Sequence, residues 1–303
     1  VAIVGAPNAG KSTLVNALVG SKVSIVSPKV QTTRMRVIGI AMADLPGESA
    51  AEGERAQVVL VDTPGIFRIA KRRLERAMVA AAWQGAEDAD VVALVIDAER
   101  GVGEETRAII ERLKESKAPR YLVLNKIDLV PREKLLTLTA EVNALLPFES
   151  VFMVSALKND GVADILKTVA ARLPAGPFLY PEDQAADLPL RLLAAEVTRE
   201  QVFLQLHQEL PYEAAVETEK WEERKDGGVR IEQTIHVQRE GQRAIVLGKG
   251  GAKIKQIGAR ARHELGQMLE RPVHLFLHVK VSERWAEDPS HYRTIGLDFE
   301  PKK

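Results

Sequence analysis

The sequence contains no cysteine among its 303 residues, and this absence limits the kinds of protein it can be. Without thiols the chain can form neither a disulfide framework nor a thiolate metal site, and it suits a reducing compartment. The chain also has no net charge, since 42 lysines and arginines balance 42 aspartates and glutamates. Any contact with nucleic acid must therefore come from a local concentration of basic side chains, because no global excess attracts phosphate.

Long apolar runs are also missing. No stretch approaches the roughly 18 residues that a membrane span requires, and no signal peptide is visible. The chain begins at Val1, inside the first expected strand, so we expect the native start and any targeting information to lie upstream. We expect a cytoplasmic protein.

The length favours two domains, and the 46% of hydrophobic residues is ample for two cores. Residues 1–173 alternate short apolar runs with amphipathic helices, the pattern of an α/β domain with a mostly parallel sheet. We predict that the run at 37–42 pairs antiparallel with 57–61. The expected buried strands are Val1–Val4, Gln57–Val61, Val91–Ile96, Tyr121–Leu124 and Val151–Val154.

Residues 174–189 are rich in proline and show no helical or strand periodicity, so they are predicted to link the two domains. Residues 190–303 are predicted to form a smaller α+β domain. Its expected elements are a helix at 190–210, strands at 229–237 and 275–281, and a helix between these strands.

A glycine-rich loop follows the first expected strand. It has the spacing G-x4-G-K-S, from Gly5 to Ser12, in which backbone N–H groups turn toward phosphate oxygens and a helix begins. Lys11 is placed to reach the β- and γ-phosphates of a nucleotide. The residues expected to hold the phosphates are Asn8, Ala9, Gly10, Lys11, Ser12 and Thr13.

Two further motifs follow later strands. Asp62-Thr63-Pro64-Gly65 comes after the strand at 57–61, and Asn125-Lys126-Ile127-Asp128 after the strand at 121–124. The carboxyl ends of parallel strands share one edge of a sheet, where ligands bind, so these groups should gather there. Each motif alone could be a turn or a helix cap, but their joint occurrence indicates a nucleotide site.

The third motif identifies the base. The Asp128 carboxylate can accept two hydrogen bonds, from the N1–H and the exocyclic amine of guanine, which adenine cannot supply. We expect Asn125 and Asp128 to hold guanine and Lys126 to pack its aliphatic stem over the ring. Backbone N–H groups of Ser155, Ala156 and Leu157 should reach the guanine O6. The pocket is therefore predicted to bind GTP and GDP.

A magnesium ion beside the phosphates needs oxygen ligands. We predict Ser12, Thr33 and Asp62 as its ligands, with the aspartate acting through water, and we favour Thr33 over Thr32. The Gly65 N–H would sense the γ-phosphate, so that hydrolysis releases both loops. Lys11, Thr33 and Gly65 are therefore the residues expected to act in catalysis.

A second glycine-rich loop, Gly248-Lys249-Gly250-Gly251, precedes an amphipathic helix in the second domain. It matches the G-x-x-G loop of KH domains, which clamps about four nucleotides of single-stranded nucleic acid. From Arg239 to Arg262, seven basic side chains accompany one acidic side chain. Two other readings stay open, an ordinary turn and a solvated basic helix face. The predicted RNA-binding residues are Gly248, Lys249, Gly250, Gly251, Lys253 and Lys255.

Together these motifs resemble those of the Era family of bacterial ribosome-assembly GTPases. The resemblance spans nearly the whole chain and includes Ser27–Arg34, Pro177–Asp183 and Trp285–Pro289. It implies a P-loop GTPase domain followed by a type II KH domain, with Mg²⁺ as cofactor. It also implies binding near the 3′ end of 16S ribosomal RNA and a role in assembly of the 30S subunit. A cytoplasmic monomer is expected, and weak peripheral attachment to the inner membrane stays open.

The resemblance also bears on hydrolysis. Ile66 stands where Ras-like enzymes carry a glutamine that orients the attacking water. Isoleucine can neither donate nor accept a hydrogen bond, and the family resembled implies slow intrinsic hydrolysis. Asn8 matches a P-loop asparagine with which some relatives hold K⁺ against the phosphates. Two roles for Asn8 stay open, K⁺ binding and stabilisation of the loop itself.

Two other functions fit parts of the sequence. In the first, the chain is a GTP-dependent tRNA-modification or membrane-linked cell-cycle regulator whose second domain docks a protein. In the second, the C-terminal domain is a purely structural partner for the switch. Binding of single-stranded RNA would separate both from an RNA-binding GTPase.

Overall fold

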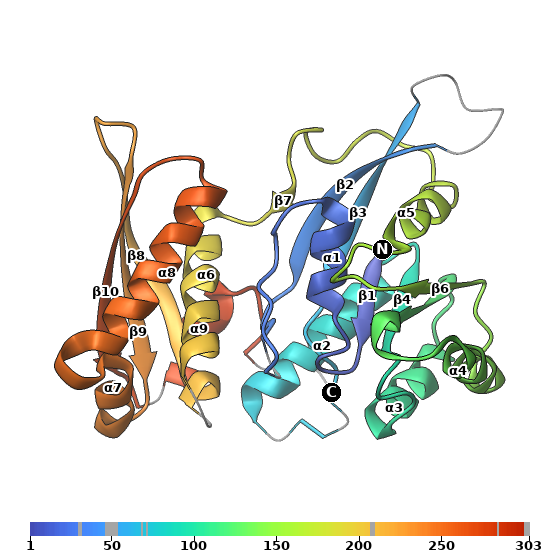
Figure 1. Cartoon of the computed structure of the whole chain (residues 1–303), viewed down its shortest axis with the longest axis horizontal. Coiled ribbons are helices and arrows are strands. Elements are labelled where there is room, and N and C mark those ends of the chain that lie inside the picture. Colours follow the sequence, from blue (N-terminus) through green and yellow to red (C-terminus); the bar gives the residue numbers. More distant parts are fainter. Residues whose placement is uncertain are drawn as a thin grey trace. The chain divides into compact units, whose positions relative to one another are not determined.

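The structure is a computed structural model that describes residues 1–29, 32–45, 54–67, 69–70, 72–206, 210–283 and 285–299. The chain divides into two compact units (Figure 1). The first is Val1–Asp187 with the described residues from Gly296 onward, and the second is Leu188–Ile295. Each unit is described separately below.

The first unit is built on a seven-stranded sheet with the order β6-β5-β4-β1-β3-β2-β7. The central strand β1 pairs in parallel with β3 and β4, and β2 pairs antiparallel with β3, as predicted. The strands are β1 (Ala2–Gly5), β2 (Val37–Asp44), β3 (Arg55–Asp62), β4 (Val92–Asp97), β5 (Arg120–Asn125), β6 (Ser150–Val154) and β7 (Ala186–Asp187).

Helices cover both faces of this sheet, so its central strands are buried on two sides. Alternate strand residues pack against α1 and α5 on one face and against α2, α3 and α4 on the other. Burial on both faces explains why these strands are continuous apolar runs. The helices are α1 (Lys11–Val19), α2 (Arg73–Glu87), α3 (Glu104–Leu113), α4 (Arg132–Leu145) and α5 (Val162–Ala170).

The strand β7 lies inside the segment 174–189 that the sequence predicts as a linker. It pairs with β2, which places Asp187 opposite Ile38 and Ala186 opposite Gly39. The Gln57 side chain on β3 holds the same segment. Its Oε1 accepts from the N–H groups of Leu179 at 2.9 Å and Tyr180 at 3.0 Å, and its Nε2 donates to the Tyr180 carbonyl at 2.8 Å. The observed division between units therefore comes after Asp187 instead of at residue 173.

The second unit contains a three-stranded sheet with the order β10-β9-β8, covered by helices on one face. β9 pairs antiparallel with β8 and parallel with β10. Its elements follow the order of a type II KH domain, which agrees with the predicted α+β class. They are α6 (Leu190–Gln205), β8 (Ala215–Glu223), β9 (Val229–Val237), α7 (Glu240–Leu247), α8 (Ala252–Met268), β10 (Val273–Val281) and α9 (Pro289–Thr294).

Helix α6 ends before the predicted position at residue 210. Its last helical residue is Gln205, and Leu206 turns to an extended conformation while its N–H still caps the Val202 carbonyl. The Leu206 side chain is buried in the core beside Val202 and Ile235, so tertiary packing ends the helix there. Within the described ranges, none of the helices has both the length and the apolar character needed to span a bilayer.

Candidate nucleotide-binding and RNA-binding sites

The glycine-rich loop connects β1 to α1 in a conformation that requires glycine. Gly10 has a φ of 93°, and a Cβ there would lie 2.2 Å from Nδ2 of Asn125. The helix α1 begins at Lys11 with no acidic residue in its first turn. Its first N–H groups and its dipole therefore suit an anion, as expected for a phosphate-binding loop.

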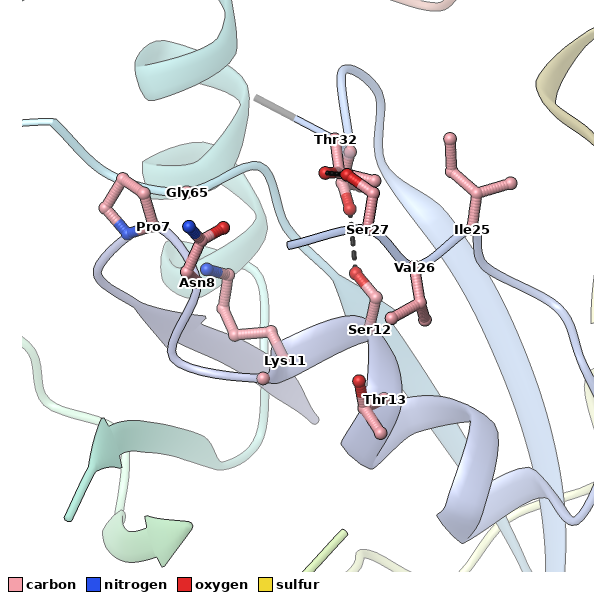
Figure 2. Close-up of a pocket in the computed structure, with 12 residues that line it drawn as sticks. Pro7, Asn8, Lys11, Ser12, Thr13, Ile25, Val26, Ser27, Thr32 and Gly65 are labelled. Carbon is pink, nitrogen blue, oxygen red and sulfur yellow. Dashed lines mark hydrogen bonds between the residues drawn. The ribbon is translucent and has the colours of Figure 1, made fainter. Parts of the chain in front are cut away.

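Lys11 lies inside this loop and is almost fully buried. Its ammonium group donates to the carbonyls of Gly5 at 3.1 Å and Ala6 at 3.0 Å. Burial lowers the pKa of Lys11 to about 8, and the nearby Asp62 charge opposes the shift. The lysine that was predicted to reach the β- and γ-phosphates thus lines the pocket together with Asn8 and Ser12 (Figure 2).

The segment after α1 lies against the phosphate loop. The Ser12 and Thr33 hydroxyl oxygens are 2.7 Å apart. Thr32 instead bonds within its own segment, to the Ser27 hydroxyl at 2.6 Å and the Lys29 carbonyl at 2.7 Å. Of the two threonines considered, Thr33 is therefore the one beside Ser12. The neighbouring Val30 and Gln31 of the sequence motif lie outside the described residues.

Asp62 ends β3 at the same edge of the sheet and is fully buried. Burial raises the pKa of its carboxyl group, while the hydrogen bond from the Ser24 hydroxyl, the nearby Ser12 hydroxyl and the Lys11 charge oppose this change. Its Oδ2 accepts a hydrogen bond from Ser24 at 2.7 Å. Its Oδ1 is buried and has no hydrogen-bond partner within the described ranges. The structure thus gathers the oxygen atoms of Ser12, Thr33 and Asp62, a donor set that suits a hard cation.

Gly65 follows Asp62 and lies directly against the phosphate loop. A Cβ at Gly65 would be 3.0 Å from the Cα of Pro7, so a larger residue would push the two loops apart. The next residue, Ile66, donates its N–H to the Gly5 carbonyl at 3.2 Å and buries its side chain in the core. Ile66 therefore has a packing role, and it offers no polar group to a water molecule.

The Asn125 side chain connects three loops of the pocket. Its Nδ2 donates to the Ala9 carbonyl at 3.0 Å. Its Oδ1 accepts from the N–H groups of Lys126 at 2.8 Å and Ala156 at 3.0 Å. These contacts brace the loops against one another. Direct contact of Asn125 with guanine stays a prediction.

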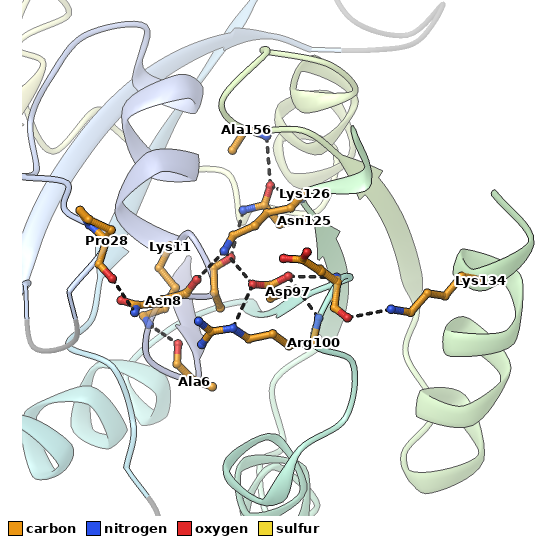
Figure 3. A network of polar contacts seen from close by, with 12 residues as sticks. Ala6, Asn8, Lys11, Pro28, Asp97, Arg100, Asn125, Lys126, Lys134 and Ala156 are labelled. Atoms are coloured by element: carbon orange, nitrogen blue, oxygen red, sulfur yellow. Dashed lines mark hydrogen bonds and ion pairs between the residues drawn. The ribbon is translucent and has the colours of Figure 1, made fainter. Parts of the chain in front are cut away.

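Lys126 adopts a left-handed conformation, with a φ of 65°. Its ammonium group donates to the Asn8 carbonyl at 2.9 Å and to Oδ2 of Asp97 at 2.6 Å (Figure 3). Anchoring the head group in this way fixes the aliphatic stem that was predicted to cover the base. Asp97 belongs to none of the predicted motifs, although it ends β4 at the same sheet edge and so obeys the rule that located Asp62.

The loop that follows β6, residues 155–160, lies beside Asp128 and contains the other groups expected around the base. The Lys158 ammonium lies 3.4 Å from Oδ2 of Asp128, and a hydrogen bond from the Ser155 hydroxyl lowers the pKa of Asp128. The Ser155 N–H donates to the Asp160 carbonyl, and the Ala156 N–H to Asn125. Of the three predicted O6 donors, only the Leu157 N–H lacks an acceptor in the described part of the chain.

Asn8 also adopts a left-handed conformation, with a φ of 63°. Its Nδ2 donates to the Pro28 carbonyl at 3.0 Å, which ties the phosphate loop to the segment after α1. This contact corresponds to the loop-stabilising role considered for Asn8. Its side-chain oxygen is not engaged by that bond.

The loop in the second unit also needs glycine. Gly248, Gly250 and Gly251 have φ values of 70°, 60° and 77°. A Cβ at Gly248 would lie 2.7 Å from the Cβ of Lys253, whereas nothing lies within 4 Å of a Cβ at Gly250. The tip of the loop is therefore open, and a sugar-phosphate backbone can approach it closely.

Basic and apolar groups surround this loop. Lys249 and Lys255 are exposed, and Nζ of Lys253 lies 3.4 Å from Gln256 on the solvent side of α8. The helix α8 begins directly after the loop with no acidic residue in its first turn, so its N-terminus favours an anion. Ile245, just before the loop, is 55% exposed and offers an apolar surface to a base.

Comparison with known proteins places both units in established families. A model of 50S ribosome-binding GTPases matches residues 1–126, and a KH-domain model matches residues 209–286. A protein named GTPase Era from Afipia carboxidovorans is 58% identical over 303 residues, which cover 100% of this chain and 94% of that protein. GTPase Era from Rhizobium meliloti is 58% identical over 99% of this chain and 92% of its own length.

Two solved structures match nearly the whole length of the chain. A variant of Aquifex aeolicus Era bound to GDP·AlF4⁻ has a TM-score of 0.89 and 41% identity, with 97% of each chain covered. Era in complex with MgGDPNP and nucleotides 1506–1542 of 16S ribosomal RNA matches with the same TM-score, identity and coverage. The similarity extends from the glycine-rich loop through the G-x-x-G loop, and the chain therefore belongs to the Era family of GTPases.

Proposed function

We propose that this GTPase is a molecular switch that binds 16S ribosomal RNA near its 3′ end and acts in assembly of the 30S subunit. The observation that carries the proposal is the similarity, over 97% of the chain, to an Era structure in complex with MgGDPNP and a 16S RNA fragment. The open glycine loop at Gly250 and the exposed side chain of Lys249 support it, because both suit a single-stranded RNA backbone.

In this proposal Mg²⁺ is held with the nucleotide by Ser12 and Thr33, with Asp62 acting through water. The donor set fits, since two hydroxyl oxygens lie 2.7 Å apart and the nearby carboxylate has a buried oxygen without a partner in the described residues. The ion would neutralise charge that develops between the β- and γ-phosphates. Lys11 would supply a second positive charge from the loop. Loss of the γ-phosphate would release Thr33 and Gly65 from the site.

Intrinsic hydrolysis is expected to be slow, because Ile66 cannot orient water. K⁺ held by the Asn8 side-chain oxygen would supply positive charge in the transition state. Turnover in equal concentrations of KCl and NaCl tests this role, and a several-fold higher rate in KCl is expected. Equal rates would leave Asn8 with its bond to Pro28 as its whole role.

The RNA-binding part is tested with the full chain and a fluorescent RNA that carries the 16S 3′-terminal sequence. Binding is measured by fluorescence anisotropy for the parent chain, Gly250→Asp and the control Gly227→Asp. Both glycines have positive φ and nothing within 4 Å of a Cβ, but Gly227 lies in the turn between β8 and β9. A carboxylate at position 250 should repel phosphate and reduce affinity at least tenfold.

The control variant should bind RNA as the parent chain does, and both variants should keep their affinity for GDP. If the parent chain does not bind the RNA, the second unit would instead dock a protein or support the switch structurally. Equal losses in both variants would also contradict the proposed site, since the effect would then follow the added charge and not its position.

We also propose that the chain acts in the cytoplasm as a monomer with weak peripheral attachment to the inner membrane, as the family resemblance implies. Size-exclusion chromatography with light scattering tests the monomer, and sedimentation with anionic lipid vesicles tests the attachment.

A further inference from the structure

The loop that follows α1 is held to that helix by one side chain. Oδ1 of Asn16 accepts from the N–H groups of Val23 and Ser24, both at 2.9 Å. Nδ2 of the same residue donates to the Ser24 carbonyl at 2.8 Å. The backbone of Ser24 is therefore fixed at its N–H and at its C=O. Asn16 lies one turn after Ser12 on the same helix, so this anchor shares the helix that carries the phosphate loop.

The side chain of Ser24 is directed by this anchor to the end of β3. Its hydroxyl donates to Oδ2 of Asp62 at 2.7 Å, and the two residues are 3% and 0% exposed. A hydrogen bond to a carboxylate is stronger than one between neutral groups, and exclusion of water strengthens it further. The bond therefore restricts the orientation of the carboxylate group. The second oxygen of Asp62 is left without a partner among the described residues.

We propose that Ser24 is a positioning residue that orients the Asp62 carboxylate for Mg²⁺ and its bound water. In this role the Ser24 hydroxyl binds Oδ2 of Asp62, so that Oδ1 can face the metal ion and its water. Asn16 in turn fixes the position of Ser24. This inference rests on the proposed Mg²⁺-dependent nucleotide binding. Ser24 itself touches neither the metal nor the nucleotide in this assignment.

A purely structural role would be different. In that case the hydroxyl would satisfy a buried carboxylate and stabilise the fold, but Mg²⁺ would bind equally well without it. The two roles can be distinguished by a readout that depends on the metal and not on hydrolysis. The rate at which bound GDP dissociates is such a readout, because Mg²⁺ slows dissociation when it bridges protein and phosphate oxygens.

The experiment measures dissociation of a fluorescent GDP analogue from the full chain, in EDTA and over a Mg²⁺ titration. The variants are Ser24→Ala, Ser24→Cys and Ser24→Thr, with Thr198→Val as control. Thr198 also makes a buried hydroxyl bond, to Gln233 at 2.5 Å, but in the second unit. The Mg²⁺ concentration for half-maximal slowing should rise about tenfold in Ser24→Ala, the effect of losing one hydrogen bond to a charged group.

Rates in EDTA should stay within about twofold of the parent chain, since a hydrogen bond that acts only on the metal side leaves metal-free binding unchanged. Ser24→Thr retains the hydroxyl, so its Mg²⁺ concentration for half-maximal slowing should equal that of the parent chain. Thr198→Val should leave this concentration unchanged. Ser24→Cys is nearly isosteric but a weak donor, so it should shift the midpoint in the same direction as alanine. It also gives the answer if Ser24→Ala does not fold, as judged by circular dichroism.

An unchanged midpoint in both Ser24→Ala and Ser24→Cys would overturn the proposal. It would also be overturned if dissociation in EDTA accelerated as much as dissociation in Mg²⁺, since Ser24 would then shape the whole pocket. Failure of the parent chain itself to bind GDP, or to respond to Mg²⁺, would instead refute the proposed function. The two failures are therefore distinguishable.

Discussion

The Nδ2 group of Asn125 donates a hydrogen bond to the Ala9 carbonyl at 3.0 Å, although 116 residues separate the two in sequence. The same side chain accepts from the Ala156 N–H at 3.0 Å. One buried amide thus joins the phosphate loop to both loops that surround the base. Asn125 therefore stabilises the pocket itself, whereas its sequence motif predicted only a contact with the nucleotide base.

Replacing Asn125 by alanine should therefore destabilise the protein even without nucleotide. The change leaves the Lys126 and Ala156 N–H groups and the Ala9 carbonyl without a partner, at a cost of about 2–4 kcal/mol. Urea unfolding of the nucleotide-free chain measures this free energy. Asp128→Asn is the control and should change it by less than about 0.5 kcal/mol. Equal stability of Asn125→Ala and the parent chain would show that the bracing contacts contribute nothing.

Asp128→Asn should change which base the pocket accepts. An amide cannot accept both guanine hydrogen bonds, so affinity for GDP should fall roughly a hundredfold or more. Xanthine carries a carbonyl where guanine carries its amino group, and an amide can donate to that carbonyl. Competition against a fluorescent GDP analogue should therefore show a gain for XDP over GDP. If the variant still prefers GDP as strongly as the parent chain, Asp128 does not face the base.

The lowered pKa of Lys11 should make the stability of the nucleotide-free protein depend on pH. Burial lowers the pKa of Lys11 from 10.5 to about 8, so between these pH values the unfolded chain holds one more proton than the folded chain. Stability should rise with pH across that window, by ~3 kcal/mol at most. Below pH 8 both states are protonated, and the full cost of burying the charge remains.

The Lys11→Met variant provides the comparison for this pH effect. Methionine buries no charge, so its stability should lack the rise that the parent chain shows above pH 8. The difference in urea midpoint between the two proteins, measured at pH 7.5 and pH 9.5, isolates the lysine from other groups that titrate in this range. A difference that does not vary with pH would mean that Lys11 keeps an ordinary pKa in the folded state.

Gln57 should control access to the proline-rich segment before β7. Gln57→Ala removes three hydrogen bonds to Leu179 and Tyr180, so this backbone should open more often. Limited chymotrypsin digestion should then cut after Phe178 or Leu179 about ten times faster, as expected from a loss of ~1.4 kcal/mol in local stability.

The control for this digestion is Arg55→Ala. Its exposed ion pair with Glu182, at 3.0 Å, lies in the same region, but such surface pairs contribute little. Digestion of this variant should match that of the parent chain. If Gln57→Ala were digested at the same rate as the parent chain, the pairing of β7 with β2 would be what protects this segment from chymotrypsin.

Much of the site could be predicted because its polar motifs begin directly after apolar strands in the sequence. Asp62 and Asn125 each end a buried run, so one rule about sheet edges brings them together. The same rule applies to Asp97, which the sequence analysis overlooked. Prediction succeeds here because a buried strand is visible as a local run of apolar residues, and the motif comes directly after that run.

Other features depend on contacts with no local pattern. Ser24 reaches a partner 38 residues away, and a single serine in a loop carries no periodicity. β7 has two residues, which are too few to show alternation, and the prolines around it favour a linker. The early end of α6 depends on burial of Leu206 in the core, and the sequence has no glycine or proline at positions 206–210 to signal a stop.

The pairing of β7 with β2 also determines where the chain could be divided. The Ile40 N–H donates to the Ala185 carbonyl at 2.8 Å, so the outer edge of β2 is paired around Ile38–Ile40 by a segment beyond residue 173. A fragment that stopped at residue 173 would present β2 as a bare edge, and unpaired edges recruit strands from other molecules. The proline-rich stretch thus serves the first unit as protection against self-association.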